Sequence, residues 1–237
     1  MEHSFLDKYS NLNSLIHKLD PRVKILSFFL YILFVISTSP LNFFQFAIFL
    51  VIIFIVIFIS HVPVIYILKK SIVIIPYVIL VAVFIPFIKK SNGLLILWNI
   101  TIKSFLSILS MIILSSTTKF PILLKGLEAL HFPKILIILL SFMYRYIFIL
   151  IDETMRMYRA WCGRYFGGEY KRQVKIFGNI IGVLFIRTYE RAERIYQNMT
   201  ARGFNGKIRT LNRLKFTFID ILFFILFFGI IIAVKIL

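Results

Sequence analysis

The sequence has few residues for cross-linking the chain or for making an acidic surface. It has one cysteine, Cys162, among 237 residues, so no disulfide can form within a single chain. Asp and Glu number 10 against 28 Lys and Arg, and the formal net charge is +18. Because long uncharged runs accompany these basic residues, we expect contact with a membrane face or an acidic partner, and no nucleic acid.

Common nucleotide-binding and catalytic motifs are also missing. The chain has no G-x-x-x-x-G-K-[ST], so it is not expected to bind or hydrolyse ATP itself. It has neither H-E-x-x-H nor G-x-S-x-G, and no two of its four histidines have the spacing of a metal site on one helix face. We therefore expect a non-catalytic protein with no cofactor or metal site of its own.

Long apolar runs are abundant, and 60% of the residues are hydrophobic. No charged residue occurs from Ile25 to Ser60. As one helix this run would be ~54 Å long at ~1.5 Å per residue, which exceeds the ~30 Å hydrocarbon core of a bilayer. The chain must therefore turn back within it, and Pro40 and Asn42 supply the turn. These features predict an all-α protein that crosses a membrane several times.

Five helices are expected to span the membrane. Two of them contain features that should change their local geometry: Pro76 and Pro86 should kink the third helix, and Lys103 lies near one end of the fourth, where it can reach the polar boundary. The expected spans are 24–39, 43–60, a segment between Lys70 and Lys89, 99–118, and a segment between Lys215 and Lys235.

A sixth apolar run, 135–151, is long enough to span but carries Arg145 near its centre. A central Arg in a bilayer costs ~2.5–3.5 kcal/mol on insertion scales. If the run does not span, 24 Lys and Arg lie on the cytoplasmic side and four outside; if it does, 17 lie outside and 10 inside. The positive-inside rule thus favours five spans with a cytoplasmic N-terminus in the cell membrane.

The expected organisation has four parts. Residues 1–22 form a cytoplasmic N-terminal segment, 23–118 hold four spans, 119–214 form a cytoplasmic module, and 215–237 hold the last span. Within the module we expect a short helix at 122–131, a long helix from Lys134 to about Arg164, and a second long helix from about Tyr170 to Arg202. The module is so apolar that it must lie against the membrane or against partner proteins.

One face of the second long helix is apolar. Its residues recur at spacings of three and four, which is typical of one helical face: Phe185, Tyr189, Ala192, Tyr196 and Met199. Gly178 and Gly182 form a G-x-x-x-G, which permits close helix approach. Two interpretations of this pair remain open: packing within the module, or contact with another subunit.

Several stretches together resemble the T components of energy-coupling-factor transporters, most closely the cobalt or nickel permease CbiQ. The main one is the run 187–206, RTYERAERIYQNMTARGFNG, which contains the triplet Ala201-Arg202-Gly203 at the end of the expected helix. A related triplet of the family has only its arginine in Gly163-Arg164-Tyr165. Three further stretches match in order: LDKY at 6–9, LIHKLDPRVK at 15–24, and YRYIFIL at 144–150 followed by Asp152 and Glu153.

This resemblance implies a coupling subunit of an ATP-driven importer. Its partners would be two ABC ATPase subunits, which bind the ATP, and a substrate-binding membrane S component similar to CbiM or NikM. Arg164 and Arg202, with Gly163, Ala201 and Gly203 beside them, would each grip one ATPase, because an arginine offers five donors in a rigid fork. Tyr189, Ala192, Tyr196 and Met199 would lie where the two long helices cross.

Three points stay open at this stage. Arg145 either snorkels or pairs locally with Asp152 or Glu153, or it helps to dock its helix against the transmembrane helices or the substrate-binding subunit. The cargo is cobalt, nickel or a vitamin, because no residue of this chain identifies it. The rival interpretations are a conventional permease that forms its own pore as a dimer, and an integral membrane enzyme. The spans contain few convergent polar residues, which argues against the enzyme.

Overall fold

The computed structural model describes residues 9–10, 12, 14–40, 42–88, 93–164, 167, 170–206 and 216–236. Every regular element in this part of the chain is an α-helix. The chain forms two compact units. Unit 1 comprises residues 1–132 and 214–237, and unit 2 comprises residues 133–213.

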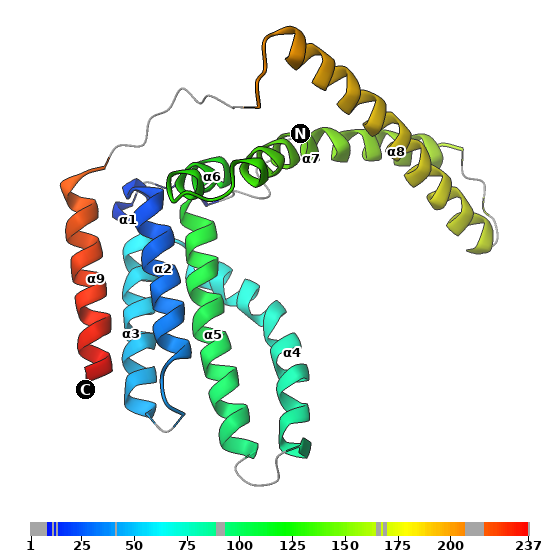
Figure 1. Ribbon diagram of the computed structural model, residues 1–237. Helices are drawn as coiled ribbons and strands as arrows, with labels where there is room; N and C mark the ends of the chain where they lie inside the picture. The colour runs from blue at the N-terminus through cyan, green and yellow to red at the C-terminus, as the bar shows by residue number, and fades with distance from the viewer. Residues whose placement is uncertain are drawn as a thin grey trace. The chain divides into compact units, whose positions relative to one another are not determined.

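Unit 1 contains seven helices in the described ranges, and most match the expected spans closely (Figure 1). The short helix α1 was not expected. Helix α4 continues through Pro76 and bends partway along its length, as the proline predicts (Figure 1). The seven helices are α1 (Leu15–Lys18), α2 (Pro21–Ile36), α3 (Phe43–Ser60), α4 (Val64–Ile88), α5 (Gly93–Thr117), α6 (Phe120–Ala129) and α9 (Phe218–Ile236).

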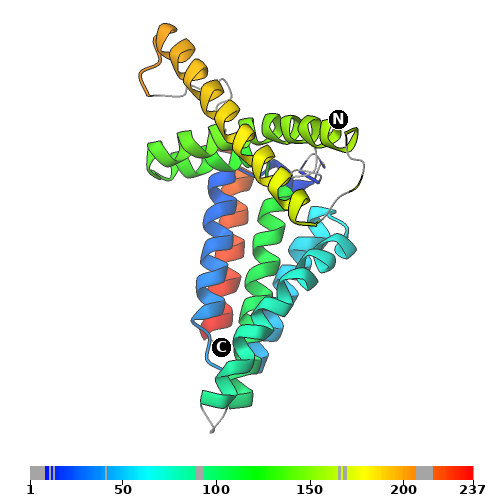
Figure 2. The same cartoon turned by 90° about the vertical axis from the view of Figure 1, so that its right-hand side faces the viewer.

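Helix α2 organises unit 1, because α5, α6 and α9 all pack against it. Figure 2 shows α2 and α9 running side by side. Tyr31 of α2 is fully buried, and its hydroxyl donates a hydrogen bond of 3.0 Å to the carbonyl of Phe49 in α3. The Tyr31 ring lies 6.2 Å from that of Phe227 in α9. One aromatic side chain thus joins three helices and satisfies its only polar group.

The N-terminal end of α2 is held by buried charges. Asp20 caps the helix by accepting from the backbone N–H of Arg22 at 2.9 Å. Asp220 of α9 accepts 2.7 Å bonds from the backbone N–H groups of both Asp20 and Thr217. Carboxylates are stabilised at helix N-termini by the free N–H groups and the helix dipole, so one aspartate fastens the starts of α2 and α9 together.

Lys24 lies one turn into α2 and is 2% exposed. Its ammonium donates to the carbonyls of His17 and Thr117 and to the hydroxyl of Thr118, at 3.1 to 3.3 Å. It therefore joins α1, α2 and the C-terminal end of α5, where helix carbonyls carry partial negative charge. A buried lysine is tolerated here because its ammonium donates to three acceptors.

The C-terminal end of α2 has the complementary arrangement. Lys103 of α5 donates to the carbonyls of Ile36 and Thr38 at 2.8 and 2.7 Å. Lys235 of α9 donates to the hydroxyl of Ser37 at 2.6 Å. Both lysines thus stabilise carbonyls and a hydroxyl at a helix end, where cations are favoured.

Helix α6 packs against the first turn of α2. A Cβ added to Gly126 would lie 2.9 Å from the Cδ1 of Ile25 and 3.1 Å from the Cβ of Pro21, so glycine permits this close approach. The expected short helix at 122–131 is therefore present at Phe120–Ala129, and it belongs to unit 1. The second compact unit accordingly begins at Pro133.

Within the described ranges, four helices have the length and apolar composition needed to cross a membrane: Phe43–Ser60, Leu95–Thr117, Lys134–Cys162 and Phe218–Lys235. Three of them coincide with expected spans. The fourth is the helix that contains Arg145, so length and composition alone do not separate it from the others. Helix α2, with 16 residues, is shorter than these four.

Unit 2 consists of two long helices, α7 (Lys134–Cys162) and α8 (Tyr170–Ala201), which cross each other (Figures 1 and 2). Among their described side chains only Ile137 is buried. Large apolar residues such as Ile181 and Phe185 are 66% and 72% exposed. Both units expose large apolar side chains, but the buried apolar core lies in unit 1.

Candidate functional site

The two helices of unit 2 run antiparallel, because contacts pair rising residue numbers on α7 with falling numbers on α8. Near one end the Trp161 and Phe177 rings lie 4.9 Å apart. Two turns back along α7, Glu153 accepts a 2.7 Å bond from Arg187 of α8. The same carboxylate accepts a 2.5 Å bond from Arg156 on its own helix. An aromatic contact and an ion pair thus fix the register of the two helices.

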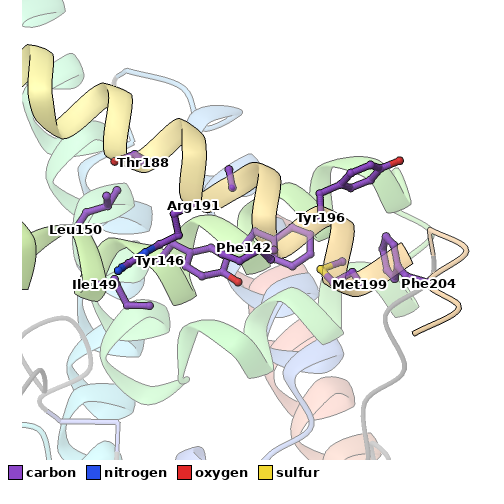
Figure 3. Close-up of a pocket in the computed structure, with 11 residues that line it drawn as sticks. Phe142, Tyr146, Ile149, Leu150, Thr188, Arg191, Tyr196, Met199 and Phe204 are labelled. Atoms are coloured by element: carbon purple, nitrogen blue, oxygen red, sulfur yellow. The ribbon is translucent and has the colours of Figure 1, made fainter. Parts of the chain in front are cut away.

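Beyond this ion pair the helices enclose an apolar groove with a volume of about 390 Å³ (Figure 3). Its walls are almost entirely carbon, with Arg191 reaching from α8 toward α7 (Figure 3). We call this feature the aromatic groove. It is lined by Phe142, Tyr146, Ile149, Leu150, Thr188, Arg191, Ala192, Ile195, Tyr196, Met199 and Phe204.

The groove brings together three of the four residues expected at the helix crossing: Ala192, Tyr196 and Met199 line it. Tyr189 does not line it and is 66% exposed. The periodicity of α8 identifies the apolar face but does not show how far round the helix the partner helix reaches.

Helix α8 ends in a complete Schellman motif. The N–H of Phe204 donates to the carbonyl of Met199 at 3.0 Å, and that of Gly203 donates to the carbonyl of Thr200 at 2.9 Å. Gly203 has φ +77°, the left-handed conformation expected of a glycine at this position. The side chains of Met199 and Phe204 lie beside each other in the groove (Figure 3). The motif leaves Arg202 at the cap position, exposed to solvent.

Helix α7 ends differently. Gly163 is its C-cap in a right-handed conformation with φ −68°, and its N–H donates to the carbonyl of Arg159 at 3.0 Å. Arg164 follows, exposed, with its N–H on the carbonyl of Trp161 at 3.0 Å. Tyr165, the third residue of the expected triplet, lies outside the described residues. The two arginines therefore follow helix ends of different geometry.

Because the helices are antiparallel and each arginine follows a C-terminus, Arg164 and Arg202 lie at opposite ends of the crossed pair. Both are exposed and carry a permanent positive charge. Each also sits where a helix dipole favours a cation, which is a sufficient structural reason for an arginine there. Their role as grips stays a prediction.

Arg145 is exposed, and its guanidinium lies 5.9 Å from the ring centre of Tyr146. Of the two acidic residues considered as its local partners, Glu153 is engaged by Arg156 and Arg187 instead.

Gly178 and Gly182 differ from the expectation that they pack closely within the module. A Cβ added at either glycine would meet nothing within 4 Å, so neither lies at a close contact between the described helices.

Sequence reasoning missed the contributions of Phe142, Tyr146, Phe204 and the Glu153–Arg187 pair to the site. A signal existed for the aromatics, because Phe142, Tyr146 and Ile149 recur at spacings of four and three along α7. The role of Phe204 could have been inferred from its place directly after Gly203, since a hydrophobic contact accompanies most Schellman ends. The ion pair depends on the register of two helices, which no local pattern gives.

Comparison with known proteins now identifies the family. The family model described as CbiQ, cobalt transport protein, matches residues 12–214. This chain belongs to the CbiQ family. The match covers most of unit 1 and all of unit 2.

Related proteins match this chain over different lengths. An uncharacterised protein of Methanocaldococcus jannaschii is 27% identical over 98% of this chain and 85% of its own length. The energy-coupling factor transporter transmembrane protein EcfT of Listeria innocua is 28% identical over 90% of each chain. The cobalt transport protein CbiQ of Rhodobacter capsulatus is 31% identical over 42% of this chain and 41% of its own. These matches confirm the resemblance to T components, and the chain is a membrane protein of that transport family.

Proposed function

We propose that this CbiQ-family chain couples two ABC ATPase subunits to a separate substrate-binding membrane subunit, and that the complex imports cobalt or nickel ions. The observation that carries the proposal is the placement of two exposed arginines, Arg164 and Arg202, at opposite ends of one antiparallel helix pair. A subunit that must hold two ATPases at once requires two separated contacts, and one pair of crossed helices supplies them.

The mechanism is mechanical and needs no catalytic residue in this chain. Each arginine would enter an acidic groove of one ATPase and form charge-assisted, often bidentate hydrogen bonds. Closure of the ATPases on ATP would bring the two arginines closer and change the angle at which α7 and α8 cross. Ala192, Tyr196 and Met199 line the groove at that crossing, so a changed angle would reshape the surface offered to the substrate-binding subunit.

The proposed arrangement in the membrane has five spans, a cytoplasmic N-terminus, and residues 119–214 against the inner leaflet of the cell membrane. Two features support it. The charge distribution favours a cytoplasmic location for residues 119–214. The apolar side chains that unit 2 leaves exposed also suit a membrane surface or a membrane partner better than open water.

Cys162 tests this arrangement without any substitution, because it is the only cysteine and is exposed at the end of α7. With five spans, a membrane-impermeant thiol reagent should label it in inside-out vesicles and not in intact cells. Labelling in intact cells would mean that α7 crosses the membrane, and the five-span arrangement would be wrong.

The cobalt or nickel cargo is supported by the description of the family and by the name of the Rhodobacter relative. The relatives named EcfT match 87–92% of this chain but their names specify no cargo, so a vitamin is the second candidate. Uptake of radioactive Co²⁺ and Ni²⁺ by cells expressing the whole complex, against cells lacking this chain, distinguishes the two. Normal metal uptake without this chain would contradict the metal proposal.

The coupling role is tested by affinity purification of the tagged protein in mild detergent, followed by identification of the bound chains. Wild type should retain two ATPase copies and one other membrane protein. Arg202→Glu should lose ATPase, whereas Lys175→Glu, an equal charge reversal at an exposed position of the same helix, should not. Recovery of the wild-type protein alone, or only as its own dimer, would overturn the proposal.

A further inference from the structure

A second hollow adjoins the aromatic groove on the same two helices. It has a volume of about 260 Å³, and we call it the arginine hollow. The two hollows share three lining residues, Leu150, Thr188 and Arg191, so an apolar part and a charged part adjoin along the same two helices. The arginine hollow is lined by Leu150, Glu153, Arg187, Thr188, Glu190, Arg191 and Arg194.

The charged part has a surplus of positive charge. Its walls carry three arginines and two glutamates. Glu153 is occupied by Arg187 at 2.7 Å and by Arg156 at 2.5 Å, so its charge is already matched within the chain. For Arg191 and Arg194 the structure records no ion pair with any described residue. Their two guanidinium groups, with only Glu190 still unmatched beside them, favour an anion.

The apolar part excludes a simple soluble anion as the ligand. An inorganic anion would use the arginines and leave the aromatic groove empty, although the groove has the volume of a small-molecule site, which is typically ~300–1,000 Å³. A neutral apolar molecule would fill the groove and ignore the arginines. Figure 3 shows Arg191 extending along the groove beside Tyr146 and Ile149, so one side chain borders both parts.

A single molecule with an apolar chain and an anionic head satisfies both parts. We propose that the aromatic groove and the arginine hollow together bind one anionic diacyl phospholipid. One acyl chain lies in the groove, and the phosphate accepts charge-assisted hydrogen bonds from Arg191 and Arg194. A phospholipid whose head also carries a cation fits less well, because that cation would face the same arginines.

The proposal rests on the placement of residues 119–214 against the inner leaflet, because only there can a membrane lipid reach the depression. Anionic lipids are attracted to basic segments at that surface. The bound lipid would fill the space at the crossing of α7 and α8 and hold that crossing at the membrane surface.

Native mass spectrometry of the complete complex tests the lipid preference, with phosphatidylglycerol or phosphatidylcholine added to the detergent. Wild type should bind phosphatidylglycerol more tightly than phosphatidylcholine. The double substitution Arg191→Gln with Arg194→Gln should weaken phosphatidylglycerol binding about a hundredfold, because it removes two charge-assisted contacts and each contributes about tenfold. Binding of phosphatidylcholine should not change.

A matched control separates a site from general attraction to a basic protein. Lys171→Gln with Lys175→Gln removes the same charge from exposed positions of the same helix, outside both hollows. This variant should bind phosphatidylglycerol like wild type. Equal weakening by the two double substitutions would overturn the proposal, because the lipid would then respond only to net charge.

The apolar half has its own test. Ala192→Phe fills the groove and leaves both arginines in place, so it should weaken binding of the diacyl lipid and leave inorganic phosphate binding unchanged. Undiminished lipid binding by this variant would exclude the groove. A photo-reactive side chain introduced at position 192 should acquire the mass of a phospholipid in membranes. Attachment to a polypeptide instead would show that a partner helix occupies the groove, and would overturn the proposal.

The same spectra keep this proposal separate from the coupling function. They count the ATPase subunits that accompany the chain as well as its lipids. Wild type without ATPases but with selective phosphatidylglycerol would contradict the coupling role and retain the lipid site. Wild type with two ATPases and no lipid preference would support the coupling role and contradict the lipid site.

Discussion

Units 1 and 2 differ in whether the chain itself buries a core. In unit 1 apolar side chains of six helices meet in one core, and the buried Lys24 and Asp220 are hydrogen-bonded. In unit 2 two helices meet along an aromatic contact, one ion pair and an open groove, and Ile137 is the only buried side chain among the described residues of that unit. Both units expose large apolar side chains, but the buried core lies in unit 1.

This difference predicts where substitutions act. A change in unit 1 should lower the stability of the chain, because the buried groups there have no alternative partner. A change on the surface of unit 2 should leave stability nearly unchanged and alter binding, because its exposed side chains contribute little to folding. The following predictions test that division, in order of decreasing effect on free energy.

The largest loss is expected from Asp220→Ala. Asp220 is 1% exposed and accepts two 2.7 Å bonds from backbone N–H groups at the starts of α2 and α9. Removing it leaves the buried N–H of Asp20 without an acceptor and removes the cap of α9 at the exposed Thr217, which together should lower the free energy of unfolding by about 3 kcal/mol. Thermal unfolding in detergent measures this. Glu193→Ala, at an exposed position of α8, is the control and should change it by less than about 0.5 kcal/mol.

The arginines of unit 2 should show the opposite behaviour. Arg164→Glu and Arg202→Glu should each weaken one ATPase contact by about 2 kcal/mol or more, and the double variant should bind no ATPase. The thermal unfolding temperature should stay at the wild-type value, because both side chains are exposed. Quantified pull-down with unfolding on the same samples checks both statements. A double variant that retains both ATPases would show that the grips lie elsewhere.

Substituting one glycine in each unit tests the comparison through smaller losses of stability, of about 1–3 kcal/mol. Gly126→Ala places a Cβ within 3.3 Å of the backbone of Pro21 and should destabilise unit 1 by overpacking, by about 1–3 kcal/mol. Gly203 has open space around it but φ +77°, so Gly203→Ala should cost about 1 kcal/mol in backbone strain. That strain acts next to Arg202, and we expect weaker ATPase binding from Gly203→Ala and not from Gly126→Ala. Equal ATPase binding by the two variants would contradict this.

The smallest effect concerns pH and His17 of unit 1. Burial, and to a lesser degree nearby Lys24, lowers the pKa of His17 below its ordinary value. The neutral ring suits its contacts, since Nε2 donates to the carbonyl of Tyr9 at 3.0 Å and Nδ1 accepts from the hydroxyl of Ser14 at 2.7 Å. With a lower pKa in the folded state, the unfolded state binds more protons, so stability falls as pH drops below about 6.5.

We expect the unfolding temperature of wild type to decrease between pH 7.5 and 5.5 by more than that of His17→Gln. The difference should be small, because the ring is partly exposed and solvent screens its charge. Parallel pH profiles for the two proteins would mean that another group causes the decrease.

Much of the helix layout followed from local sequence. The uncharged run from Ile25 to Ser60, interrupted by Pro40, predicts the hairpin of α2 and α3, and α3 occupies the expected residues 43–60. Gly203 predicts the end of α8, because only glycine adopts φ > 0 readily and the apolar periodicity stops there. Helix α1 was missed because four residues are too few for a periodic signal.

The candidate site depended more on tertiary contacts. The spacing of Ala192, Tyr196 and Met199 predicts one apolar face of α8 and no partner for it. The register of α8 on α7 is fixed by the contacts of Trp161 with Phe177 and of Glu153 with Arg187. That register places Phe142 and Tyr146 opposite the apolar face of α8 and leaves Tyr189 outside the groove. Such a register depends on pairs of residues 16 and 34 positions apart in the chain, and nothing local to either helix encodes it.

The sequence by itself determined the class of protein, the apolar runs, the helix ends and the family. Tertiary structure decided which charges are buried and which are free. Asp220 and Lys24 look like ordinary boundary charges in the sequence, but α2, α5 and α9 bring helix ends around them, so backbone groups become their partners. Arg191 and Arg194 line the arginine hollow without an ion pair to any described residue, since Glu153 on the opposite helix is engaged by Arg156 and Arg187. The reason is physical: hydrophobicity and backbone conformation act residue by residue, whereas the partner of a charge depends on what folding brings near it.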